Sequence, residues 1–364
     1  MPRQFLRAAT HVAPKKAVGA VAWAIALGLS SCTAPSASDT TGANANPTAE
    51  DTLQVVTTFL PMTQFTTAVA GDRAEVVQLL PINVGPHDYQ AKPGDVRAIA
   101  QADVLIKNGL EAEFFLDSMI ENAGNADLEI VDSSEGIETL VSASDHNHAH
   151  DDHGHDDDEA HKDDDHEDHE EDHDDDHGED HDEDHDKASE SADPHVWLDP
   201  KRAIEQVENI RDGLIAADPE GEAEYVANAE TFIAELTALD TDISTMLAPF
   251  EGKTFIVFHD FAAYFADSYG LQFEALVGVP EENPSPQDVK RVVEIAQAEG
   301  LKSLLAEPQV EQTSFDTLSD DLGVDISAFN AMEAGSTEAI ESDYYLETMR
   351  QNAQNIAAGF GASD

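Results

Sequence analysis

Cysteine, basic residues and long apolar runs are all scarce in this sequence of 364 residues. Cys32 is the only cysteine, so no disulfide can form within the chain. The 18 lysines and arginines stand against 76 aspartates and glutamates, for a formal net charge of -58 that opposes binding to nucleic acid or an anionic membrane surface. No stretch approaches the roughly 18 consecutive apolar residues of a membrane-spanning helix. Hydrophobic residues still make up 41% of the chain, which is enough for ordinary globular cores.

Histidine is also scarce outside one segment. Of the 16 histidines, 12 lie in an acidic segment at 145–186 and His11 lies near the N-terminus. The rest of the chain therefore contains only His87, His195 and His259. These three are the natural candidates for a site in the folded part of the protein.

The first 32 residues have the organisation of an export signal. Four basic residues precede an apolar run at 17–29, which is too short for a comfortable membrane span. The run ends in Leu29-Ser30-Ser31-Cys32, which resembles the bacterial lipobox. The resemblance implies that Cys32 becomes the lipid-modified first residue of the mature protein; the alternative is a signal peptide with an incidental cysteine. Residues 33–51, rich in Ser, Thr, Ala, Asn and Pro, are expected to form a flexible tether.

From residue 53 onward, strand patterns alternate with helical patterns. Strands are expected at 53–59, 74–80, 103–107, 128–131, 254–258, 273–277, 303–306 and 324–329. Helices are expected at 62–70, 93–100, 111–123, 200–217, 222–247, 261–269, 287–298, 314–322 and 344–360. Strand and helix in alternation predict parallel sheets that are covered on both faces.

This order predicts an α/β fold with two similar lobes, mainly parallel sheets and a long connecting helix. The N-terminal lobe is expected at 52–144 and is completed by 187–221, the connecting helix at 222–250 and the C-terminal lobe at 251–364. A helix over 222–247 would be about 39 Å long at 1.5 Å per residue, enough to connect two small domains. Such a layout places a ligand in the cleft between the lobes, outside the carboxyl ends of the strands.

The acidic segment at 145–186 interrupts the first lobe. Of its 42 residues, 24 are acidic and 12 are His, so it is predicted to be a disordered insertion with too little apolar surface to fold. Imidazoles among carboxylates offer many weak sites for zinc or other divalent ions, whereas charge alone would merely keep the chain soluble. Because histidine at this density adds nothing to solubility, we favour an auxiliary role in gathering or sensing metal. The histidines concerned are His146, His148, His150, His153, His155, His161, His166, His169, His173, His177, His181 and His185.

The three histidines of the body all fall at strand ends or in loops. His87 follows the strand expected at 74–80, His195 precedes a helix, and His259 ends a strand. A single histidine in such a place is ordinarily a surface or hydrogen-bonded residue. Three neutral imidazoles converging on one point would instead bind a borderline metal, with zinc ahead of manganese. A fourth tetrahedral position would remain for water or a nearby carboxylate.

Five short blocks resemble the signature sequences of metal-receptor lipoproteins that serve bacterial ABC importers for zinc and manganese. They are Gly85-Pro86-His87-Asp88-Tyr89, Asp193-Pro194-His195-Val196-Trp197-Leu198-Asp199-Pro200, Val257-Phe258-His259-Asp260, Pro284-Ser285-Pro286 and Ala306-Glu307-Pro308-Gln309. The resemblance implies two α/β lobes joined by a rigid helix, with the metal held between them by His87, His195 and His259. It favours zinc over manganese, because members with Glu in place of the third histidine tend toward manganese. Zinc-specific members also often carry a His-rich acidic loop between the first two blocks.

Two positions depart from the family pattern. Members often offer an Asp from a Leu-Asp-Pro-Leu block in the second lobe, and the matching stretch here, Phe329-Asn330-Ala331-Met332, has Asn330 instead. Some zinc members carry Glu directly before the first histidine, where this chain has Pro86. Asn330 remains a candidate site position, and water is the fourth ligand that we expect.

The expected function is that of a periplasmic or otherwise extracytoplasmic zinc receptor, anchored to a membrane only by its lipid. It would deliver Zn²⁺ to the membrane permease of an ABC importer, without enzymatic turnover and as a monomer. Affinity should fall as imidazole is protonated, because the neutral ring is the metal ligand.

Two other classes of function remain open at this point. The first is a zinc hydrolase or lyase, because three histidines and a water also form a catalytic site. Asp88, Asp260, Glu282 or Glu307 would then be the general base, although the sequence has no His-Glu-x-x-His motif. The second is an extracellular zinc store or adhesin-like protein, in which the insertion is the working part.

Overall fold

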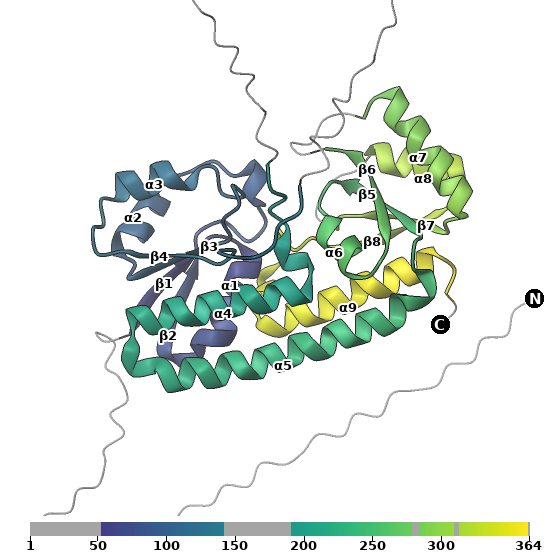
Figure 1. Cartoon of the computed structure of the whole chain (residues 1–364). Helices are drawn as coiled ribbons and strands as arrows, with labels where there is room; N and C mark the ends of the chain where they lie inside the picture. Colours follow the sequence, from purple (N-terminus) through teal and green to yellow (C-terminus); the bar gives the residue numbers. More distant parts are fainter. Residues whose placement is uncertain (1–51, 142–190, 279–283, 309–312, 363–364) are drawn as a thin grey trace, which may run out of the picture. The chain divides into compact units, whose positions relative to one another are not determined.

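A computed structural model describes residues 52–141, 191–278, 284–308 and 313–362. Cys32, Glu282 and the twelve histidines of the insertion lie outside the described residues. Within these ranges the chain forms two four-stranded parallel sheets with helices packed on them (Figure 1). The α/β fold with two lobes expected from the alternating pattern is confirmed.

The first sheet has the strand order β2-β1-β3-β4, and all of its neighbouring strands are parallel. Its central strands are short apolar runs whose residues are buried, as in β3, because helices cover both faces of a parallel sheet. The strands are β1 (Leu53–Thr57), β2 (Ala74–Gln78), β3 (Val104–Lys107) and β4 (Glu129–Asp132). The helices α2 (Pro93–Gln101) and α3 (Leu116–Ala123) lie above this sheet in Figure 1, and α1 (Leu60–Ala70) and α4 (Pro200–Ala217) also pack on its strands.

The second sheet repeats the same arrangement with the order β6-β5-β7-β8, again entirely parallel. Its strands are β5 (Thr254–His259), β6 (Gln272–Val277), β7 (Ser303–Ala306) and β8 (Asp325–Ala328). Its helices are α6 (Ala263–Ser268), α7 (Pro286–Glu299), α8 (Thr313–Leu322) and α9 (Ser342–Gly359). Because β5 and β7 are neighbours that run in the same direction, their carboxyl ends lie at the same edge of the sheet.

The long helix α5 (Glu222–Leu247) connects the two halves. Its buried side chains recur every three or four residues, which is the period of one helical face. They are Tyr225, Ala229, Phe232, Leu236, Leu239, Ile243 and Leu247. This face packs on α4 and α9, so α5 belongs to the core of the described protein and does not cross open solvent.

One helix begins later than its pattern predicts. The apolar pattern at 111–123 predicts a helix from residue 111, but α3 begins at Leu116. Gly109, Leu110 and Glu111 instead have positive φ angles of 87°, 54° and 62°. The carboxylate of Glu113 accepts hydrogen bonds from the backbone N–H groups of Asn108 and Gly109, and these bonds stabilise the turn.

None of the helices in the part of the chain that the structure describes is both long and apolar enough to cross a membrane.

Candidate metal centre

His87 lies in a short 3₁₀ turn, Pro86–Asp88, between β2 and α2. The turn is held on the first half by the following residue, Tyr89, whose buried ring packs on Phe115 with ring centroids 4.7 Å apart. The hydroxyl of Tyr89 also donates to the carboxylate of Asp95 in α2. The His87 side chain keeps about a quarter of its surface exposed, at 24%.

His195 lies at the start of the short 3₁₀ turn Val196–Leu198, just before α4, and its side chain is buried. Asp193 fixes it from two residues away, because one carboxylate oxygen lies 2.9 Å from the His195 backbone nitrogen and 2.7 Å from its Nδ1. A carboxylate can only accept, so Nδ1 carries a hydrogen and Nε2 points to the opposite side.

The rest of the Asp-Pro-His-Val-Trp-Leu-Asp-Pro block also has a structural role. Asp199 caps α4 by accepting from the backbone N–H of Lys201 at 3.0 Å, and Pro200 takes the first helical position, where its missing N–H is harmless. Trp197 is fully buried and its indole N–H donates to the carbonyl of Ala331 at 2.8 Å. The block thus begins a helix and presents a histidine within eight residues.

His259 is the last residue of β5 and is buried. Its Nδ1 lies 2.5 Å from a carboxylate oxygen of Glu307, which directly follows β7. The two residues meet because β5 and β7 are parallel neighbours, so their carboxyl ends lie together. Glu307 thus orients His259 as Asp193 orients His195.

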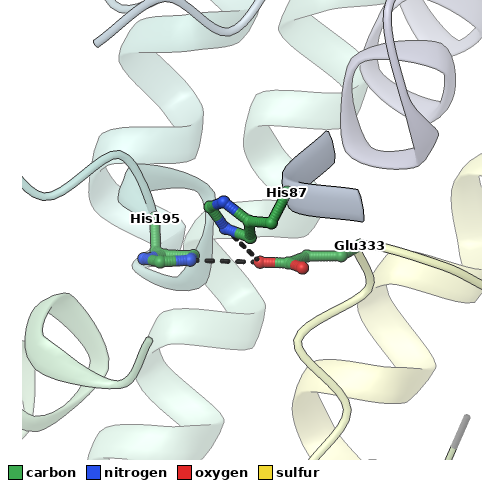
Figure 2. A group of neighbouring side chains, drawn as sticks. All are labelled: His87, His195 and Glu333. Carbon is green, nitrogen blue, oxygen red and sulfur yellow. Dashed lines mark hydrogen bonds and ion pairs between the residues drawn. The ribbon is translucent and has the colours of Figure 1, made fainter. Parts of the chain in front are cut away.

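Glu333, in the loop after β8, completes the site, and sequence reasoning missed it. One of its carboxylate oxygens, Oε1, lies 3.1 Å from His195 Nε2 and 3.3 Å from His87 Nε2 (Figure 2). It also lies 4.0 Å from His259 Nε2. His87, His195 and Glu333 each offer one ligand atom within 4.8 Å of the others.

Asn330, the position taken from the family pattern, is placed differently. Its Nδ2 donates to the Tyr344 hydroxyl at 3.2 Å, and its Oδ1 accepts from the backbone N–H of Met332 at 2.9 Å. The side chain therefore shapes the turn that leads to Glu333, whose carboxylate is a candidate fourth ligand beside the water that we expected. Glu333 follows the carboxyl end of β8, at the same edge of the sheet as His259. This place after a strand end was the one signal in the sequence that could have identified Glu333.

The separations between these atoms are compatible with a metal site. Zinc to ligand distances of about 2.0–2.1 Å put two ligand atoms of a tetrahedron about 3.3 Å apart. The contacts of Glu333 Oε1 with His195 and His87 match that spacing, and the contact with His259 is longer. Imidazole nitrogens with one carboxylate oxygen form a donor set that suits zinc.

The charges of the cluster are strongly coupled. Burial by itself lowers the pKa of His195, but the carboxylates of Asp193 and Glu333 outweigh it and raise the pKa to about 10. Burial likewise lowers the pKa of His259, but the carboxylates of Glu307 and Glu333 outweigh burial, so that the pKa is raised. Burial favours a higher pKa of Glu333, yet His87, His195 and His259 hold that pKa well below its ordinary value. Without metal, the raised pKa values of His195 and His259 favour protonated rings beside the buried carboxylate of Glu333.

Comparisons with known proteins found similar chains that are named for metal binding or metal uptake. The manganese-binding lipoprotein MntA of Halalkalibacterium halodurans is 29% identical over 326 residues, which cover 87% of this chain and 92% of the relative. The high-affinity zinc uptake system protein ZnuA of Bacillus subtilis is 31% identical over 304 residues, which cover 83% of this chain and 86% of the relative.

A crystal structure of a ZnuA has the same fold, with a TM-score of 0.66 and 24% identity over 85% of this chain and 100% of that chain. Residues 55–359 match the family of the zinc-uptake complex component A, periplasmic, and the chain therefore belongs to this ZnuA family, as its sequence blocks indicated.

Proposed function

We propose that this chain is an extracytoplasmic receptor that binds Zn²⁺ with high affinity and delivers it to an ABC permease. The observation that carries the proposal is the convergence of His87, His195 and His259 on one oxygen of Glu333. These four side chains are the proposed ligands of the transported ion. Zinc is favoured over manganese because three of the four donors are imidazole nitrogens, whereas manganese prefers a larger share of carboxylates.

The same arrangement favours binding over catalysis. A catalytic zinc site has three protein ligands and keeps the fourth position for water, whereas a site with four protein ligands is closed. In the proposed site, Glu333 supplies the fourth ligand in place of the water that a hydrolase retains. Membership of a family named for zinc uptake supports the same conclusion.

The cellular arrangement is proposed from the sequence and the family. Cys32 would carry the lipid, and the chain would work as a monomer that meets its permease at the membrane. The acidic insertion at 145–186 would gather or sense metal. Mass spectrometry of the membrane fraction tests whether Cys32 carries a lipid. Cys32→Ser should remove the lipid and release the protein from the membrane.

Calorimetric titration of the metal-free protein, with a competing chelator, tests the proposed cargo. We expect one submicromolar site for Zn²⁺ and much weaker binding of Mn²⁺. His195→Ala should weaken the tight site by more than the about 10- to 100-fold that loss of an outer partner costs. His153→Ala, the same change within the insertion, is the matched control and should leave the tight site unchanged. Tighter binding of Mn²⁺ than of Zn²⁺, or no tight site, would contradict the proposal.

A further inference from the structure

Glu333 belongs to the C-terminal half of the sequence, yet the segment that carries it is attached to the N-terminal half of the molecule. The indole N–H of Trp197 donates to the carbonyl of Ala331 at 2.8 Å. The backbone N–H of Gly335 donates to the carbonyl of Ile82, in the loop that leads to His87, at 2.7 Å. Further along, the side-chain amide of Gln64 in α1 donates to the carbonyl of Ala339 at 2.5 Å.

Close packing reinforces these bonds. A Cβ added to Gly85 would lie 3.0 Å from Oε2 of Glu333, so the loop of the first ligand leaves room for this carboxylate and little more. Met332 is buried and has a φ of 61°, a left-handed conformation that is unfavourable for a side chain of its size. Such a conformation persists only where the surroundings hold it, which indicates that the position of Glu333 is fixed before any ion arrives.

The change of attachment occurs at Asn330. The backbone N–H of Phe329 still donates to Ala306 at the end of β7, and Asn330 exchanges two hydrogen bonds with Asn352 of α9. Met332 still donates its backbone N–H to Asn330, but Ala331 and Gly335, which lie on either side of Glu333, are bonded to Trp197 and Ile82 of the first half. Glu333 therefore shares a rigid frame with His87 and His195.

His259 is held by other parts of the molecule. It ends a strand that pairs with β6, its Nδ1 is bound by Glu307, and its ring packs on Phe261 with centroids 4.8 Å apart. Its Nε2 lies 4.0 Å from Glu333 Oε1, farther than the Nε2 atoms of His195 and His87 at 3.1 and 3.3 Å. The ligands thus divide into a compact group of three and a single histidine on the second sheet.

We propose that His87, His195 and Glu333 form a preassembled acceptor for the ion, that Trp197 is its positioning residue, and that His259 binds last and governs release. This inference rests on the proposed function. Preassembled ligands bind without first being ordered, so the acceptor sets the association rate. When His259 alone leaves the ion, the other three ligands stay in place. Loss of His259 should therefore change mainly the dissociation rate.

Stopped-flow kinetics with Zn²⁺ and a chromophoric chelator test this order in the full chain. His259→Ala should keep an association rate close to that of the wild type and raise the dissociation rate by at least the about 10- to 100-fold typical of an outer partner. Glu333→Gln should lower the association rate as well. Equal losses of association rate in the two variants would overturn the order, while tight binding by the wild type would leave the proposed function intact.

Trp197→Phe removes the indole N–H but keeps a ring against Phe59, with which Trp197 now packs edge to face at 5.2 Å. Co²⁺ is the spectroscopic probe, because its visible absorption weakens when four-coordination is lost. We expect a weaker Co²⁺ spectrum and slower association. Tyr225→Phe is the control, because it removes a partly buried hydrogen bond to Asp218 at 2.9 Å, and it should change neither the Co²⁺ spectrum nor the association rate.

Gly85→Ala supplies a second test if Trp197→Phe does not fold. The added methyl group would press on the Glu333 carboxylate and touch neither Trp197 nor His259. It should reproduce the weaker Co²⁺ spectrum of the tryptophan variant. A wild-type spectrum in every variant that folds would overturn the role of the acceptor.

Discussion

The two halves of this protein have the same strand order, yet they hold the histidines of the candidate metal centre in different ways. His195 receives its carboxylate partner, Asp193, from two residues earlier in the chain. His259 receives its partner, Glu307, from 48 residues later, because the neighbouring strands β5 and β7 end side by side. Asp193 and His195 belong to one short block of sequence, whereas His259 and Glu307 come together only when the sheet forms.

This difference predicts that the two carboxylates are not equivalent. Asp193 bonds both the ring and the backbone of His195, so its loss frees the loop as well as the imidazole. Glu307 bonds the ring of a histidine whose backbone is already fixed in a strand.

Removal of these partners should produce the largest effect of the comparison. We expect Asp193→Ala to lower zinc affinity by about 100-fold and Glu307→Ala by about 10-fold, the two ends of the range for such partners. Competition titration measures both affinities. Asp267→Ala, which removes an exposed carboxylate in α6, should leave the affinity unchanged. A larger loss at Glu307 would show that the strand does not hold His259 as argued.

The pH dependence should separate the metal-free from the metal-bound protein. The pKa of His195 is raised to about 10 in the metal-free fold, so the stability it contributes is fully present below its ordinary pKa of 6.5 and is lost as pH rises toward 10. The raised pKa of His259 acts in the same direction, and the lowered pKa of Glu333 withdraws stability only as pH falls below its ordinary value of 4.5.

Zinc needs neutral imidazole, so its affinity should rise over the same interval and binding should release protons. Melting of the metal-free protein across pH, and calorimetry in buffers of different ionisation enthalpy, measure the two trends. Asp193→Ala should weaken the dependence of the melting temperature on pH, because it removes the carboxylate that raises the pKa of His195. A metal-free melting temperature that rises steadily from pH 6.5 to 10 would contradict the assignment.

The smallest effect on the tight site should come from the acidic insertion. The residues that flank it are tied together, since Val141 and Ala192 form an antiparallel bridge and the Asp193 N–H donates to the Leu140 carbonyl at 2.8 Å. A short linker can therefore replace 145–186 without moving His195. We expect unchanged affinity at the tight site and a lower total zinc stoichiometry, measured by titration with elemental analysis. Unchanged stoichiometry would remove the auxiliary role proposed for the insertion.

The secondary structure was largely predictable because its signals are local. The helix at 222–247 follows from apolar residues that recur on one face, and α4 follows from Asp199 and Pro200 at its start. The start of α3 was mispredicted because the left-handed turn at Gly109, Leu110 and Glu111 depends on a side-chain bond from Glu113.

The sequence alone determined the family, the alternating α/β order and the three histidines, because short motifs and periodic patterns record contacts between residues that are near in the chain. Only the tertiary structure showed that Glu333 lies beside them and that Asn330 bonds within the turn that leads to Glu333. Glu333 sits in an unremarkable loop after a strand, and its position depends on bonds from Trp197 and Ile82, more than a hundred residues earlier in the chain. Such distant partners leave no local pattern, because they come together only when both halves have folded.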